Sequence, residues 1–149
     1  MIALLQRVAD AEVRVAGEAI GHIGRGLLVF YCAEQGDAAA DCERLLQRVL
    51  RLRCFADEAG RMNRSVQDVA GGLLVVPQFT LAADTASGNR PGFSRAAAPE
   101  AGRRLYERFV ELARAHHADV ASGRFAADMQ VALVNDGPVT LWLQIPPLR

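Results

Sequence analysis

One short segment places three different functional groups where an apolar strand is expected to leave the core. Pro77 is followed by Gln78, Phe79 and Thr80, which carry an amide, an aromatic ring and a hydroxyl. A threonine hydroxyl acts as a nucleophile only with a general base beside it, and no histidine or lysine is near in sequence. An ordinary strand end with a β-branched threonine is the simpler interpretation, and a polar site is the alternative.

A second unusual segment, residues 135–140, has the sequence NDGPVT. An Asp-Gly pair is typical of a tight type I′ hairpin, but the proline that follows disturbs the return strand. A plain turn is the default interpretation, since only about 5–6% of bonds that precede proline are cis in folded proteins.

Several other kinds of chemistry find no support in the sequence. All 17 basic residues are arginine, so a lysine Schiff base and the lysine of a P-loop are excluded. His22 stands alone, and His116 and His117 are neighbours on an expected helix, where adjacent side chains point about 100° apart and do not chelate together. The nucleophile elbow G-x-S-x-G is absent. The sequence therefore predicts neither a metal site nor a cofactor.

The elements that must position these segments follow from hydrophobic periodicity. A helix is expected over residues 37–54, with Asp37 as its N-cap, and a second from Pro99 at position N1 to about His116. A long loop over residues 82–98 lies between them, and such loops are often functional. The first 33 residues are expected to form an antiparallel meander. Further strands are expected at residues 73–81, 129–135 and 139–145.

This order predicts an α+β fold in one domain, residues 1–149, with an antiparallel or mixed sheet curled towards a barrel and two packed helices. The 149 residues carry no net charge, which argues against a general nucleic-acid or membrane coat. A local basic patch from Arg90, Arg95, Arg103 and Arg104 is possible, although solvated arginines are the simpler interpretation. Three cysteines without CxxC spacing favour a reduced, cytoplasmic protein, and no apolar stretch is long enough to span a membrane.

Five segments, taken together, resemble the D-aminoacyl-tRNA deacylases, and the match is collinear over essentially the whole chain. The segments are Gln6-Arg7-Val8, Gln78-Phe79-Thr80-Leu81, Arg90-Pro91, the stretch from Gly123 to Met129 that reads GRFAADM, and NDGPVT at 135–140. The resemblance implies a cytoplasmic homodimer with a barrel-like fold and an active site at the dimer interface. It implies hydrolysis of the ester that joins a D-amino acid, or glycine mischarged on tRNA-Ala, to the tRNA 3′ end, as chiral proofreading in translation.

The resemblance also implies what the second segment does. Gly137-Pro138 would be a cis pair that enters the partner's pocket, where its backbone blocks an L side chain. Arg7 would hold this pair in place. Glycine at 137 lets a backbone carbonyl approach the substrate without a Cβ in the way.

By the same resemblance, Phe125 and Met129 would surround the terminal adenine, while Gln78, Phe79 and Thr80 would line the scissile ester. An aminoacyl ester is already activated, so its hydrolysis needs no metal or strong nucleophile. The backbone N–H groups of Phe79 and Thr80 are candidates to stabilise the negative oxygen that forms. Thr80 would position the substrate, with the substrate's 2′-hydroxyl assisting.

One position departs from the family pattern, which usually begins the 77–80 motif with serine. Pro77 removes a hydroxyl and an N–H donor at that point. Two alternatives to an esterase stay open: a catalytically silent module that binds the adenosine end of an RNA, and a small metabolite-binding barrel without an RNA partner.

Overall fold

The computed structural model describes residues 1–148, and the predicted single domain, residues 1–149, includes one residue outside that range. The long first strand, β1 (Ile2–Val15), organises the sheet. One side of β1 pairs along nearly its whole length with β8 (Met129–Gln144). Its other side pairs first with β3 (Gly26–Cys32) and then with β2 (Glu18–Ile23), all antiparallel.

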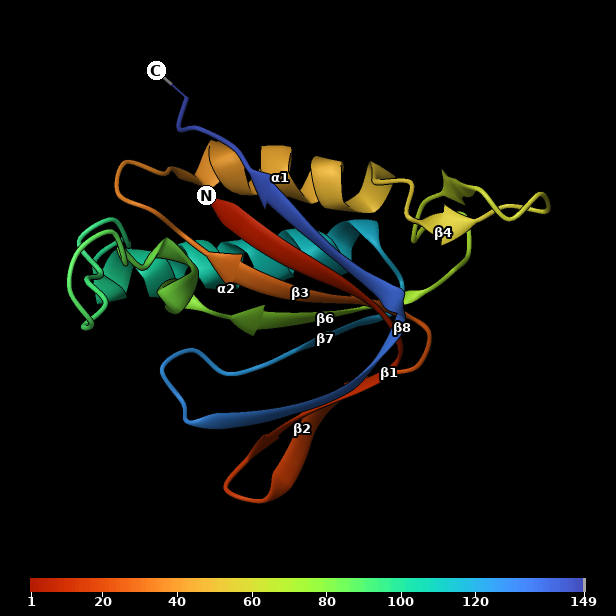
Figure 1. Ribbon diagram of the computed structural model, residues 1–149, viewed down its shortest axis with the longest axis horizontal. Coiled ribbons are helices and arrows are strands. Elements are labelled where there is room, and N and C mark those ends of the chain that lie inside the picture. Colours follow the sequence, from red (N-terminus) through yellow and green to blue (C-terminus); the bar gives the residue numbers. More distant parts are fainter. Residues whose placement is uncertain (149) are drawn as a thin grey trace.

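The sheet continues from β3 through two parallel neighbours, β6 (Gly72–Pro77) and β7 (Val120–Ser122). The two edges then approach each other, because a Cβ on Gly21 of β2 would lie 3.0 Å from the carbonyl oxygen of Ser122 on β7. The mixed sheet is thus nearly closed into a barrel (Figure 1). The predicted α+β fold with a curled sheet is confirmed.

Two helices cover one face of this sheet (Figure 1). They are α1 (Ala39–Arg51) and α2 (Pro99–His116), and the apolar side of each packs on β1, β3 and β6 in the larger core cluster. Leu45 and Phe109 are among its fully buried side chains. A second cluster, which includes Val13 and Leu74, fills the barrel interior. The second helix has the predicted bounds, since Pro99 is favourable at a helix start.

Two expectations about the first half of the chain are wrong. Asp37 is not the N-cap of α1, which is Ala38. The Asp37 carboxylate instead accepts hydrogen bonds from the Met1 amino group at 3.0 Å and from the Glu34 N–H at 2.7 Å. The first three strands are not a meander either, because β1 lies between β2 and β3 in the sheet. Both differences depend on contacts between segments distant in sequence.

Three short elements lie outside the predicted set. They are the small hairpin of β4 (Phe55–Ala56) and β5 (Met62–Arg64), the edge strand β7, and the 3-10 turn η1 (Phe79–Ala82). The expected strands at 129–135 and 139–145 form one strand, β8, which is interrupted between Asn135 and Thr140. Among residues 1–148, no helix has the length and apolar character needed to cross a membrane.

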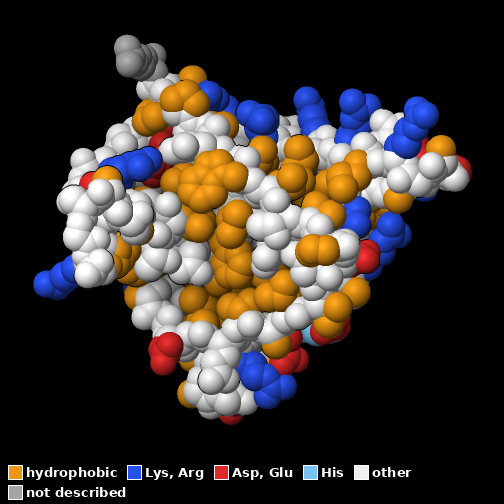
Figure 2. All heavy atoms as spheres, in the orientation of Figure 1, with side chains coloured by type: hydrophobic (Ala, Val, Ile, Leu, Met, Phe, Trp, Pro, Cys, Tyr) orange, Lys and Arg blue, Asp and Glu red, His pale blue; other side chains and the backbone are white. Residues whose placement is uncertain are grey.

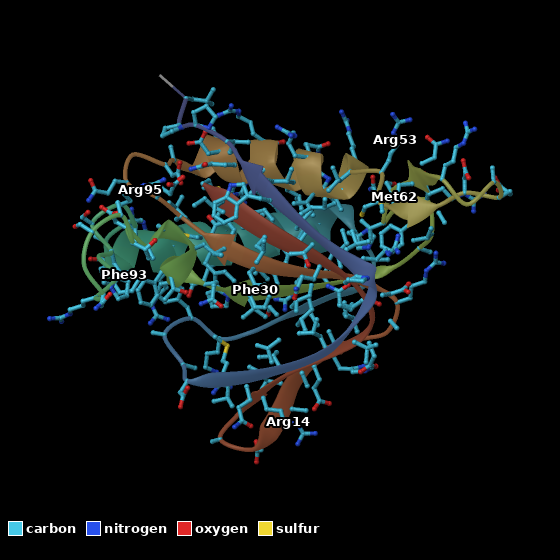
Figure 3. All side chains as sticks on the ribbon, in the orientation of Figure 1. Arg14, Phe30, Arg53, Met62, Phe93 and Arg95 are labelled. Carbon is cyan, nitrogen blue, oxygen red and sulfur yellow. The ribbon has the colours of Figure 1, made fainter. Side chains whose placement is uncertain are left out.

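The sheet face turned away from the helices carries an apolar row. Leu4 on β1 pairs with Trp142 on one side and with Phe30 on the other, so the three side chains lie next to each other. Trp142 is 51% exposed. Hydrophobic side chains gather across the middle of this face in Figure 2, and Figure 3 shows Phe30 near its centre.

Candidate active site

A pocket of about 530 Å³ opens where the ends of β3 and β6 meet the first turn of α2 and the loop that enters β8. Its volume lies in the range of small-molecule sites, which are typically roughly 300–1,000 Å³. Most of its wall is aromatic or aliphatic, and the polar groups are few. The walls include Tyr31, Val76, Gln78, Phe79, Phe125 and Met129.

The end of β6 produces the polar rim of this pocket. Residues 73–76 are a fully buried apolar run, and Pro77 ends the strand because it cannot donate to a ladder. The N–H of Gln78 then donates to the carbonyl of Tyr31 at 2.7 Å, and the chain turns into η1. This turn brings Gln78 and Phe79 to the pocket mouth. That position agrees with the alternative interpretation of the segment, a polar site at the end of the strand.

Thr80 lies beside the pocket, outside its walls. The Gln78 side-chain amide donates to the Thr80 hydroxyl oxygen at 2.5 Å, which fixes that hydroxyl. An amide cannot take up a proton at neutral pH, so this partner does not activate Thr80 as a nucleophile.

An aromatic pair extends the rim on the solvent side. The Phe79 ring meets the ring of Phe93 edge-on, with centroids 5.1 Å apart. Both rings are partly exposed, Phe79 at 56%. Figure 3 shows Phe93 and Arg95 on the long loop between η1 and α2. That loop therefore contacts the rim of the pocket through Phe93, which carried no signal in the sequence.

Two glycines lie against Phe125 and Met129 on the opposite wall. A Cβ on Gly123 would lie 2.9 Å from the Met129 sulfur, so the Met129 side chain would have to shift to admit one. A Cβ on Gly102 of α2 would lie 3.4 Å from the Phe125 ring, which is van der Waals contact. Buried Tyr106 secures the loop from below, because its hydroxyl lies 3.0 Å from the Val75 carbonyl and 3.2 Å from the Gly123 carbonyl.

The Gly137-Pro138 segment forms a protrusion in the middle of β8. Between Gln6 and Val8 on β1, the paired residues of β8 jump from Thr140 to Asn135, which leaves four residues outside the ladder. The Gly137-Pro138 bond is cis, the state that the family resemblance implies. The Asn135 side chain closes the protrusion by accepting the Val139 N–H at 2.8 Å.

Arg7 ties this protrusion to the body of the protein. Its Nε donates to the Asp136 carbonyl at 2.8 Å, and its Nη1 donates to the Cys54 carbonyl at 2.7 Å. The side chain is only 15% exposed. Position 137 requires glycine, since its φ is +145° and a Cβ there would lie 2.7 Å from a Val139 methyl group.

Within one chain, this protrusion and the pocket lie apart. Arg7 pairs with Leu27 near the start of β3, whereas the pocket begins at Tyr31, four residues further along the same strand. At a rise of about 3.3 Å per residue, that separation is roughly 13 Å along the sheet. The fold thus unites Gln78, Phe79, Phe125 and Met129, with Thr80 adjacent, and holds Gly137, Pro138 and Arg7 in a second group.

No ionisable nucleophile is available in the pocket at neutral pH. Cys32 lines it, but burial raises the pKa of its thiol to about 11, and the Glu34 carboxylate adds to the shift. A protonated thiol is a poor nucleophile. Two of the three histidines are bound elsewhere: His22 contacts Asp10 at 2.6 Å, and His117 contacts the Gly71 carbonyl. Residues 1–148 contain no cluster of three His, Cys, Asp or Glu side chains arranged to hold a metal ion.

Comparison with known proteins agrees with this geometry. The sequence pattern of the D-Tyr-tRNA(Tyr) deacylase family matches residues 4–144. The chain belongs to this family. It is 65% identical over 147 residues to the D-aminoacyl-tRNA deacylase of Paracidovorax citrulli, which covers 99% of this chain and 95% of the relative. It is 67% identical to the enzyme of the same name from Aromatoleum aromaticum, with 99% and 97% covered.

Solved structures of the same shape extend the comparison. The c-Myc DNA unwinding element binding protein superposes with a TM-score of 0.93 at 39% identity, covering 98% of this chain and 99% of the other. A probable eukaryotic D-amino acid tRNA deacylase superposes with a TM-score of 0.81 at 19% identity, covering 97% and 98%, and supports the fold alone. Membership of the deacylase family confirms the predicted enzyme class, a hydrolase.

Two deacylase residues that shape the site had no functional signal in the sequence. Tyr106 lies on the buried face of α2, and its hydroxyl contacts depend on where β6 and the loop after β7 come to lie. Gly102 lies inside the same helix, and only the fold places the Phe125 ring against it.

Proposed function

We propose that this protein hydrolyses the ester that joins a D-amino acid to the 3′ end of a tRNA, releasing the free D-amino acid and the tRNA. One observation carries the proposal: a single pocket unites Gln78, Phe79, Phe125 and Met129 in a chain of this family. The aromatic and thioether side chains suit a terminal adenine, and the turn after β6 suits the ester.

The hydrolysis needs a place for the developing negative oxygen. Pro77 has no N–H, and the N–H of Gln78 already bonds Tyr31. Phe79 and Thr80 are the first residues of η1, and the hydrogen bonds of a short turn leave its opening N–H groups unpartnered. We assign these two donors to the oxyanion. Loss of one such donor typically reduces the rate by about 10²–10³.

The attacking group in this mechanism is water. Water adds to the ester carbonyl and loses a proton, and the tetrahedral intermediate expels the 3′-oxygen of the ribose, which takes up a proton. The substrate's 2′-hydroxyl assists this transfer, since the pocket offers no side-chain base. Thr80 acts as a positioning residue, because its oxygen is held by the Gln78 amide and no base lies beside it.

The selectivity for D-amino acids and glycine rests on a second copy of the chain. Gly137 and Pro138 lie roughly 13 Å along the sheet from the pocket of their own chain, so a shared site requires a homodimer. The apolar row of exposed Trp142 and half-buried Leu4 and Phe30 offers a face for the second copy.

In the dimer, the Gly137 carbonyl of one subunit accepts a hydrogen bond from the substrate's amino group in the other. That close approach leaves no room for an L side chain, whereas glycine, which has none, is accepted. Glycine mischarged on tRNA-Ala is therefore also a substrate. The enzyme acts in the cytoplasm on aminoacyl-tRNA and needs no metal or organic cofactor.

The deciding experiment compares three substrates with the purified protein: D-Tyr-tRNA, L-Tyr-tRNA and glycine on tRNA-Ala. We expect release of D-tyrosine and glycine and no release of L-tyrosine above the spontaneous rate. Binding of the tRNA end without any release would instead favour the silent RNA-end module. Equal hydrolysis of both tyrosine enantiomers would overturn the steric account of selectivity.

A further inference from the structure

A second hollow, of about 410 Å³, lies directly behind the pocket wall. It runs between one side of α2 and residues 122–125, which lead from β7 towards β8, and Phe125 belongs to both cavities. We call it the α2 groove. Its polar lining is dominated by Arg103, Arg114 and Arg124. This arginine-lined groove shares the Phe125 wall with the substrate pocket. The part of a substrate that extends out of the pocket past Phe125 would therefore enter the groove.

Two of the three arginines are held in position, and none of the three is neutralised. The Arg103 guanidinium lies over the Phe125 ring, 5.0 Å from its centroid, at the boundary between the two cavities. Arg114 donates to the Ser122 hydroxyl at 3.0 Å. Arg124 projects from the loop itself and is exposed. Within residues 1–148, none of the three makes an ion pair with a carboxylate.

Other arginines of the chain are engaged differently. Arg44 pairs with Asp41, Arg95 with Glu34 and Arg108 with Glu111. This matters because Glu111 also lines the α2 groove, and Arg108 takes up its charge at 2.8 Å. Glu107 is the remaining acidic residue of the lining, so the groove keeps an excess of positive charge on a protein with no net charge.

The dimensions of the groove suit a polymer rather than one small anion. Arg103 and Arg114 are eleven residues apart on α2, and at about 1.5 Å per residue their backbones are separated by roughly 16 Å. Guanidinium groups recognise phosphate oxygens through paired N–H donors, and they do not lose their charge at any physiological pH.

We propose that the α2 groove binds the phosphodiester backbone of the RNA strand that leads to the terminal adenosine. The terminal nucleoside occupies the main pocket, and the phosphates on its 5′ side pass Phe125 and follow α2 from Arg103 towards Arg114. This inference rests on the proposed function, because it takes an RNA end as the occupant of the pocket. It adds a binding site for the phosphates immediately preceding the terminal adenosine.

The test compares two substrates that differ only in those phosphates, D-Tyr-tRNA and the nucleoside ester 3′-D-tyrosyl-adenosine. For each variant, the ratio of kcat/KM for the tRNA ester to kcat/KM for the nucleoside ester is measured. We expect R103Q, R114Q and R124Q each to lower this ratio by about 5-fold, and the triple variant by about 10²-fold, the scale of exposed charge pairs. R104Q is the matched control, since Arg104 adjoins Arg103 but does not line the groove, and its ratio stays at the wild-type value.

A binding measurement separates this proposal from the proposed function. Deacylated RNA ending in CCA is titrated at several salt concentrations. The plot of log affinity against log salt has a negative slope, and each lost phosphate contact reduces the magnitude of that slope by about 0.7. Arginine-dependent binding without any ester hydrolysis would reject the deacylase function and keep the groove. Normal hydrolysis of both esters with an unchanged ratio and slope in the triple variant would reject the groove and keep the function. A parallel loss on both esters would show that these arginines only support the pocket, which also rejects the groove.

Discussion

Replacement of Arg7 by methionine tests whether the protrusion at 136–139 depends on a single side chain. Arg7 joins that protrusion to the segment after α1 through the Asp136 and Cys54 carbonyls. Methionine keeps much of the apolar stem of the Arg7 side chain but removes both donors. The change therefore removes two hydrogen bonds with little loss of buried apolar surface.

The two lost hydrogen bonds are unequal. Cys54 is 1% exposed, so its carbonyl loses a charged donor that water cannot readily replace. Hydrogen bonds to charged groups contribute about 1.5–3 kcal/mol, whereas a solvent-accessible carbonyl such as that of Asp136 loses only about 0.5 kcal/mol. We expect Arg7→Met to lower the free energy of unfolding by about 2–3.5 kcal/mol. For a chain of this size, each kcal/mol lowers Tm by about 2–4 °C, so Tm falls by about 4–14 °C.

The assay is urea unfolding together with deacylation of D-Tyr-tRNA, measured well below the variant's Tm. Arg53→Met is the control, because Arg53 is exposed and donates to the Asn63 side chain at 3.0 Å, so its loss stays within about 0.5 kcal/mol. We expect kcat/KM to fall at least 10-fold for Arg7→Met and to stay unchanged for Arg53→Met. A stability loss below 0.5 kcal/mol would refute the assigned role of the Cys54 contact. Full activity despite the expected loss of stability would refute the need for an anchored protrusion.

Three further perturbations test other contacts. Thr80→Ala should lower kcat by about 2–10-fold, the loss of one neutral hydrogen bond, and leave measurable turnover; an acyl adduct on Thr80 in quenched wild-type reactions would contradict its positioning role. Because the pKa of Cys32 rises from 9.0 to about 11 on folding, the thiol stabilises the fold below pH 9, and this contribution disappears as the pH rises towards 11. The free energy of unfolding, measured from pH 8 to 11, should therefore fall less steeply in Cys32→Ala than in the wild type. Equal slopes in the two proteins would contradict this. Tyr106→Phe leaves the Gly123 carbonyl without its hydroxyl donor and should lower the free energy of unfolding in urea by about 1–2 kcal/mol. An unchanged free energy of unfolding would contradict this and show that water replaces the donor.

The sequence by itself determined the features that depend on neighbours along the chain. The bounds of α2 follow from Pro99 and a clear apolar stripe. The strand predicted over residues 73–81 is wrong at its end, because β6 stops at Pro77 and the chain turns into η1. Alternating and helical patterns were enough for the α+β class. They also identified both unusual segments, because a proline interrupts the expected pattern in each.

Only the tertiary structure decided how these segments meet. The Asp37 carboxylate binds the Met1 amino group rather than capping α1, and β1 pairs with β2, β3 and β8, because pairing register depends on which faces are buried together. The same long-range register brings Gln78 and Phe125 into one pocket and keeps Gly137 beside Arg7, away from that pocket. Local periodicity carries no information about these distances, since it records which face of an element is apolar and not which element covers it.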